Sequence, residues 1–118
     1  MKLYSGPLSL FSRKVEIALG VKGLVFERGM VAFTQERGYQ PKHPDVLAAN
    51  PKGQVPVLAD GDITLFDSTL IFEYLEDAYP APALLPPGAK ARARCRMMEL
   101  RADEVVFPHA RTFFYHTD

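Results

Sequence analysis

Asp67 and Ser68 stand directly before the apolar run Thr69 to Leu75, where the sequence predicts the start of a helix. The first amides of a helix have no partners within the helix, so this position can bind the polar end of a ligand. Upstream, Pro56 opens a β-rich stretch and has no N–H to give to a neighbouring strand. Pro56 therefore marks a sheet edge, a bulge or a cis peptide bond.

A cis bond before Pro56 would turn the amide and carbonyl of Val55 outward. An extended peptide could then pair with Val55 as an added strand, while Asp67 and Ser68 receive its polar end. An acid and a serine are also ordinary helix caps, worth about 1 kcal/mol, and the two roles are compatible. These residues predict a site for a small peptide.

The first half of the element pattern is a strand, a helix and a second strand. The strands are predicted at residues 2–5 and 24–31, and the helix between them has Ser9 or Ser12 as its N-cap and ends at Gly23. A helical crossover of this kind makes the two strands parallel.

The second half begins with a short helix over about 44–49. Asp60-Gly61 then joins two β-rich stretches as a type I′ hairpin, and a helix over 68–79 follows. Together the elements form an α/β unit of the order βαβαββα with a mixed four-stranded sheet.

Domain boundaries follow from the prolines. We expect one domain over residues 1–80, a stiff proline-rich linker over 81–88, and the start of an all-helical second domain over 89–118. One helix cannot bury a core of its own, so this last segment is predicted to expose apolar side chains, which would promote association. They are Met97, Met98, Val105, Val106, Phe107, Phe113 and Phe114.

Five segments resemble the N-terminal, thioredoxin-like domain of the cytosolic glutathione transferase superfamily, of the serine type. They are Lys2 to Ser5, Ser9 to Leu19 (SLFSRKVEIAL), Asn50 to Leu58 (NPKGQVPVL), Asp60-Gly61 and Asp67 to Leu75 (DSTLIFEYL). Together they cover roughly residues 1 to 80 in the family's order and spacing, which is more specific than any one motif.

The resemblance implies a thioredoxin-like fold and a binding site for glutathione as co-substrate. In that site Pro56 is in cis, Val55 pairs through its backbone with the cysteinyl part of glutathione, and Asp67 and Ser68 hold the γ-glutamyl end.

Two loop residues are further candidates by the same resemblance. Gln54 occupies the position from which relatives reach the bound peptide, and Lys42 lies in a segment whose lysine meets the glycine carboxylate. Both types are also common as solvated surface residues, and those readings stay open for these two positions.

Ser9 is the residue that the resemblance assigns to the thiol. An ordinary thiol has a pKa of about 8.5, and a hydroxyl donor together with a helix N-terminus favours the thiolate. Ser9 aligns with the serine that serine-type transferases use for this purpose, and Ser12 is the competing candidate. Both serines could instead serve only as helix caps.

The implied activity is conjugation of glutathione to a small electrophile. In the family an all-helical second domain supplies the electrophile pocket, so we expect a truncated family member with little turnover of its own, and a homodimer in a full-length form. The start of the chain also resembles stringent starvation protein A, a transferase-fold protein that binds RNA polymerase. Ser9 replaces an acid of that protein, which favours catalysis.

Charge and composition restrict the other functions. The formal net charge is zero, so no overall field draws the chain to nucleic acid or to a membrane. No stretch approaches the length needed to cross a bilayer and no secretory signal opens the chain, which predicts a cytoplasmic protein.

Cysteine and histidine usage argues against redox and metal chemistry. Cys95 is the single cysteine, so no Cys-x-x-Cys motif is available for thioredoxin-type exchange. His43, His109 and His116 lack the spacing of metal ligands, and we expect no metal.

Overall fold

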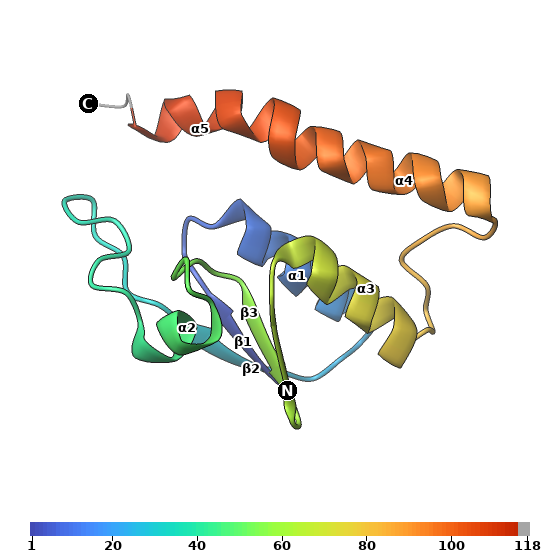
Figure 1. Cartoon of the computed structure of the whole chain (residues 1–118), viewed down its shortest axis with the longest axis horizontal. Helices are drawn as coiled ribbons and strands as arrows, with labels where there is room; N and C mark the ends of the chain where they lie inside the picture. Colours follow the sequence, from blue (N-terminus) through green and yellow to red (C-terminus); the bar gives the residue numbers. More distant parts are fainter. Residues whose placement is uncertain (116–118) are drawn as a thin grey trace. The chain divides into compact units, whose positions relative to one another are not determined.

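A computed structural model describes residues 1–115, and the chain divides into two compact units, Met1–Leu84 and Leu85–Asp118 (Figure 1). The first unit contains β1 (Lys2–Ser5), α1 (Leu10–Val21), β2 (Glu27–Met30), α2 (Pro44–Ala49), β3 (Val57–Asp60), β4 (Ile63–Phe66) and α3 (Ser68–Ala78). The second contains α4 (Ala89–Arg101), the π-helical segment η1 (Ala102–Val106) and α5 (Phe107–Tyr115).

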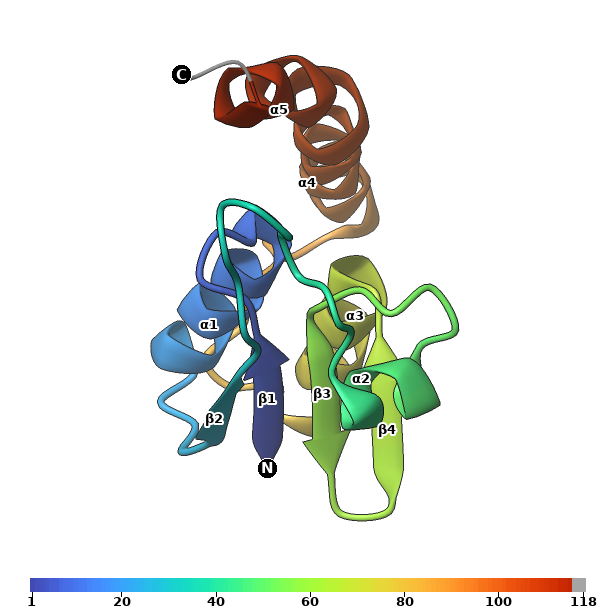
Figure 2. The same cartoon turned by 90° about the vertical axis from the view of Figure 1, so that its left-hand side faces the viewer.

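The first unit is built on a four-stranded sheet with the order β2-β1-β3-β4. β1 pairs with β2 in parallel and with β3 antiparallel, and β3 pairs antiparallel with β4. Figure 2 shows α2 on one face of the sheet and α1 and α3 on the other. The predicted thioredoxin-like fold with a mixed sheet is confirmed.

Two cores lie on the two faces of this sheet. Side chains alternate along a strand, so Leu3 and Leu58 point to one face while Val57 points to the other. Leu3 and Leu58 belong to the larger core, which α1 and α3 complete, and Val57 belongs to a smaller core with Val31 and Val46. These three strand residues are at most 1% exposed.

Helix α1 forms where the sequence predicts it, because its apolar residues follow the helical period. Val15, Ala18 and Leu19 are buried at the i, i+3 and i+4 spacing, which turns one stripe toward the sheet. Ser9 caps the first turn, and Gly23 follows the last turn with a φ of 66°.

Two predicted boundaries are wrong. The second strand covers Glu27–Met30 instead of 24–31, because its partner β1 offers only four residues for pairing. The hairpin loop is Gly61-Asp62 instead of Asp60-Gly61, since Asp60 pairs with Ile63 as part of the ladder. Gly61 has a φ of 60°, so the positive φ stands at the first loop position alone.

A buried ion pair holds the chain segment that follows α3. The Lys22 side chain is fully buried, and its Nζ lies 2.8 Å from Oε1 of Glu76. The same Nζ donates to the carbonyl oxygens of Tyr79 (2.6 Å) and Pro82 (2.9 Å). Because all these bonds are made, the desolvated charge of Lys22 is compensated and the start of the linker is fixed to α1.

The second unit is a continuous run of α4, η1 and α5. Met97, Met98, Val105, Val106 and Phe113 are exposed, as the sequence predicted for a helix without a core of its own. Phe107 is only partly exposed, and the side chain of Phe114 lies outside the described part of the structure. Within residues 1–115, no helix combines the length and apolarity that crossing a membrane requires.

The Asp60 carboxylate accepts hydrogen bonds from two tyrosines of the α3 region, Tyr74 at 2.6 Å and Tyr79. These bonds favour the charged form, so the Tyr74 hydroxyl first and the Tyr79 hydroxyl second lower the pKa of Asp60. The same contact with Asp60 raises the pKa of Tyr74 to about 12.

We expect Asp60→Asn to lower the free energy of unfolding by about 1 to 2 kcal/mol at pH 7, because two charge-assisted hydrogen bonds are weakened. Because the pKa of Asp60 is lower in the folded state, its charged form stabilises the protein at pH values above the unfolded pKa near 4. This stabilisation is lost as the pH falls through the folded pKa. Urea unfolding between pH 5 and 2 should therefore show that the free energy of unfolding falls more steeply in the wild type than in Asp60→Asn. Asp62→Asn, in the same turn, is the control, and equal slopes for wild type and Asp60→Asn would contradict the prediction.

Candidate functional site

Three segments that the sequence singles out meet at one end of the sheet. The register pairs Tyr4 with Val57 and Val57 with Phe66, which sets one row across β1, β3 and β4. Ser9 lies after β1, Val55 and Pro56 lie before β3, and Asp67 and Ser68 lie after β4. Because β3 runs antiparallel to β1 and β4, the residues after β1, before β3 and after β4 all lie at the same end of the sheet.

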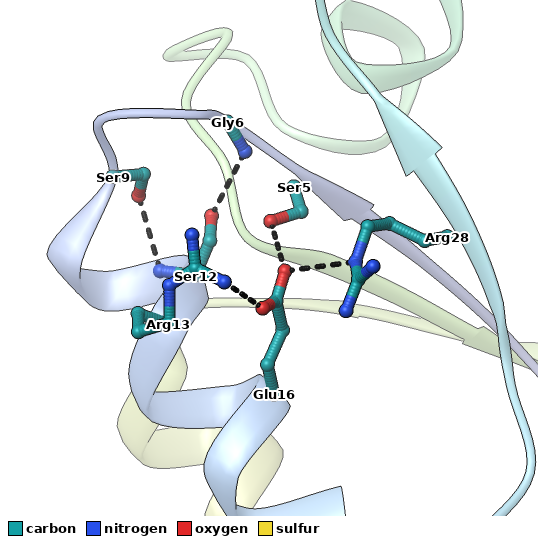
Figure 3. Close-up of polar contacts among 7 residues, drawn as sticks. All are labelled: Ser5, Gly6, Ser9, Ser12, Arg13, Glu16 and Arg28. Carbon is teal, nitrogen blue, oxygen red and sulfur yellow. Dashed lines mark hydrogen bonds and ion pairs between the residues drawn. The ribbon is translucent and has the colours of Figure 1, made fainter.

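Ser9 is the N-cap of α1, with its Oγ accepting a hydrogen bond from the Ser12 N–H at 3.0 Å (Figure 3). Its own N–H donates to the Gly6 carbonyl at 3.1 Å, which closes the turn from Gly6 to Ser9. The hydroxyl hydrogen of Ser9 has no acceptor within residues 1–115. Ser9 can therefore donate to an anion at the helix N-terminus.

Ser12 is placed differently. It is fully buried, and its Oγ accepts the Gly6 N–H at 3.4 Å (Figure 3). A ligand that stays at the surface cannot reach this hydroxyl. The geometry therefore favours Ser9 over Ser12 as the donor to a thiolate.

Glu16 binds the last residue of β1, Ser5, next to the turn. Its buried carboxylate accepts from the Ser5 hydroxyl at 2.7 Å and from Nε of Arg28 at 3.1 Å, and it pairs with Arg13 (Figure 3). These contacts join β1, β2 and α1. Arg13 and Arg28 compensate the charge of a carboxylate that burial alone would disfavour.

The segment before β3 leaves backbone groups available for a ligand. The Val55–Pro56 peptide bond is cis, and the backbone of Val55 makes no hydrogen bond within the described residues. Asn50 braces the preceding loop, donating from Nδ2 to the Gln54 carbonyl and accepting the Lys52 N–H on Oδ1, both at 3.0 Å. Gln54 itself has an exposed side chain.

Asp67 and Ser68 form the N-terminus of α3. Asp67 accepts the N–H groups of Thr69 at 3.0 Å and Leu70 at 3.2 Å, so it is the N-cap, and Ser68 is buried. Asp67 has a φ of 76°, the only positive φ among the described non-glycine residues. A backbone in this region costs about 1 to 3 kcal/mol, and such residues cluster at ligand sites.

Lys14 is a further candidate that the sequence motifs did not indicate. Its Nζ lies 3.5 Å from the Ser68 hydroxyl and 5.2 Å from the centre of the Phe72 ring. It brings a positive charge from α1 to the N-terminus of α3. A signal was present in the sequence, since a lysine near the start of a helix opposes the helix dipole.

Lys42 packs against the loop that leads to Val55. A Cβ on Gly53 would lie 3.1 Å from Cγ and Cδ of Lys42, so the lysine stem packs directly on this glycine, two residues before Val55. Gly53 also has a φ of 62°, which a side chain would disfavour. The neighbouring His43 caps α2 by accepting the Asp45 N–H at 3.2 Å.

Metal ligands do not gather in the described part of the chain. Within residues 1–115 no three His, Cys, Asp or Glu side chains are placed to share a metal ion. His116 lies outside the described residues.

The first unit is thus a thioredoxin-like domain with an unpaired backbone at Val55, directly before a cis peptide bond, and with the capped N-terminus of α3 after β4. The family described as the glutathione S-transferase N-terminal domain matches residues 3–83. The chain therefore belongs to the glutathione S-transferase family, as the resemblance predicted.

Relatives within this family include proteins of different names. The chain is 39% identical to the stringent starvation protein A homolog of Coxiella burnetii, over 87% of this chain and 46% of that protein. It is 43% identical to the maleylacetoacetate isomerase of Pseudomonas aeruginosa, over 81% of this chain and 45% of that protein. The chain thus spans about half the length of the curated relatives it matches.

A solved structure of a glutathione S-transferase also matches this chain over about half of its own length. The glutathione S-transferase of Methylobacterium radiotolerans, in complex with glutathione sulfonate, superposes with a TM-score of 0.80 at 31% identity. The match covers 99% of this chain and 53% of that chain.

We expect Asp67→Gly to be at least as stable as the wild type and Asp67→Ala to be about 1 kcal/mol less stable. Glycine removes the cost of the positive φ and caps a helix almost as well as aspartate, whereas alanine keeps the strain and loses the cap. Urea unfolding midpoints measure both variants. A glycine variant less stable than the alanine variant would show that the backbone of Asp67 is not strained.

Proposed function

We propose that this chain binds glutathione and that the whole protein conjugates it to electrophilic small molecules. The observation that carries the proposal is the convergence of the Ser9 hydroxyl, the free Val55 backbone and the α3 N-terminus at one end of the sheet. A tripeptide with a thiol in its middle residue and a carboxylate at each end needs these three kinds of group.

The γ-glutamyl end binds at the N-terminus of α3. Its carboxylate lies by the Ser68 hydroxyl and the Lys14 ammonium, which are 3.5 Å apart, and its α-amino group pairs with the Asp67 carboxylate. The cysteinyl backbone pairs with Val55 as an added strand. Gln54 contacts the peptide from the loop, and Lys42 meets the glycine carboxylate.

The thiol then lies by Ser9. A hydroxyl that donates to sulfur and the positive end of α1 both stabilise the thiolate, so the proton leaves to solvent at a lower pH than it would in free glutathione. The thiolate attacks an electrophilic carbon and forms the sulfur–carbon bond, while the electron pair of the bond broken at that carbon departs with a leaving group or, in an addition, takes up a proton from solvent. Electrophile binding is assigned to a second, helical domain that begins in 89–118, beyond the linker at 81–88.

The setting follows from this chemistry. Reduced glutathione is needed as co-substrate, which fits a cytoplasmic protein. We assign a homodimer to the full-length form, with glutathione and a small electrophile as its ligands and no role for nucleic acid or membrane.

A second candidate is a transferase-fold protein without catalysis that binds RNA polymerase. The 39% identity to a stringent starvation protein A homolog favours it. Co-purification of polymerase with a chain that does not bind glutathione would support this candidate, and turnover of a model electrophile by a full-length version would support the transferase.

We expect saturable calorimetric binding of glutathione to this chain and a loss of at least tenfold in affinity in the double variant Asp67→Ala, Ser68→Ala. The variant removes both side chains that hold the γ-glutamyl end, and each charge-assisted hydrogen bond contributes about 1.5 to 3 kcal/mol. Asp77→Ala is the control, because it removes an exposed acid from the other end of α3. Absence of binding by the wild type, or equal binding by the double variant, would overturn the proposed site.

Ser9→Ala is expected to raise the pKa of the bound glutathione thiol by about one to two units with an affinity within about twofold of the wild type. The reason is that one hydrogen bond to the thiolate is lost while the peptide contacts remain. Titration of the ultraviolet absorbance of the thiolate measures this pKa. Ser9→Thr keeps the hydroxyl and should retain the low value, and an unchanged titration in Ser9→Ala would remove Ser9 from the mechanism.

A further inference from the structure

We propose that Tyr39 is a positioning residue for Ser9: it fixes the turn that carries the Ser9 hydroxyl without touching the thiol. This inference rests on the proposed role of Ser9. Tyr39 lies in the loop between β2 and α2, far from Ser9 in the sequence. In both views this loop reaches the end of the sheet where β1 leads into α1 (Figures 1 and 2).

The first contact is a hydrogen bond to the middle of the turn. The Leu8 N–H donates to the Tyr39 hydroxyl oxygen at 2.9 Å. Leu8 directly precedes Ser9, and the turn is closed by the 3.1 Å bond from the Ser9 N–H to the Gly6 carbonyl. Tyr39 therefore holds the one turn amide that lies between these two bonded ends.

The second contact is the approach of the ring to Gly6. A Cβ on Gly6 would lie 2.6 Å from the Tyr39 hydroxyl oxygen and 2.7 and 2.8 Å from two ring carbons. The φ of Gly6 is not positive, so backbone conformation does not demand a glycine here. The glycine is needed because the Tyr39 ring occupies the place of its side chain.

The ring of Tyr39 is itself held in place. Its centre lies 4.9 Å from that of Phe33 at an interplanar angle of 59°, a favourable tilted geometry. It also packs against the smaller core, which contains Val31, Val46 and Val57. Tyr39 thus connects the smaller core to the turn.

Two hydrogen bonds to the turn fix the position of the Ser9 hydroxyl. The inner side of the turn is fixed by the bond from the Gly6 N–H to the Ser12 hydroxyl, and the outer side by Tyr39. Loss of the outer bond leaves the exposed Leu8 amide to water instead of to the anchored ring, which lets the turn shift and moves Ser9 relative to Val55. Small displacements of a donor weaken its bond to a developing charge.

The test is the thiol pKa of bound glutathione in Tyr39→Phe, which keeps the ring and removes the hydroxyl. We expect the pKa to rise by about 0.5 unit with an affinity within about twofold of the wild type. Gly6→Ala, which forces the ring away, should shift the pKa in the same direction. Tyr74→Phe removes a tyrosine hydroxyl from the opposite end of the sheet and should leave the pKa unchanged.

A double-variant cycle separates positioning from a general loss of structure. If Tyr39 acts through Ser9, Tyr39→Phe adds no further rise in the Ser9→Ala background, because there is no hydroxyl left to position. Equal shifts in both backgrounds, or no shift in the wild-type background, would overturn the inference while the proposed function stands. Failure of the wild type to bind glutathione would overturn both.

Discussion

Three backbone pairs between β1 and β3 join the two halves of the first unit, and the rest of the fold depends on them. They match Lys2 with Ala59, Leu3 with Leu58 and Tyr4 with Val57. The Leu3–Leu58 pair is almost completely buried between the sheet and its helices. A slip of β3 by one residue against β1 would turn Leu58 away from the larger core while Leu3 stays in it, so burial fixes the register. The register in turn decides which loops become neighbours.

Two of the residues at this end of the sheet, Ser9 and Asp67, combine a capping role with a proposed binding role. Ser9 and Asp67 each cap a helix, accepting N–H groups of the first turn, and each also faces the proposed ligand. Structural and binding roles therefore compete for the same polar atoms. At Ser9 they coexist, because the oxygen accepts from Ser12 while the hydrogen stays available. At Asp67 the backbone takes a positive φ that stability alone would not select.

Local patterns predicted most of the fold and some of the groups that meet at the candidate site. The bounds Lys2–Ser5 and Pro44–Ala49 match the structure because a break or a cap flanks each of them. Asp67 was predicted as the start of α3 for the same reason, as an acid before an apolar run, and it is the N-cap. The hairpin loop was placed one residue early, since Asp60 serves the ladder and binds tyrosines of the α3 region. Tyr39 was missed because it contacts Leu8 across 31 positions, and no local pattern marks such a contact.

All the groups proposed to bind glutathione belong to the unit Met1–Leu84. Their geometry is set by one sheet and its two cores, so we assign peptide binding and ionisation of the sulfur to the first unit alone. Turnover is different, because the electrophile must be held against the sulfur for the reaction to gain from proximity. Relatives with distinct names match this chain over about half of their own length, and we propose that the reaction of the thiolate depends on residues outside the matched half.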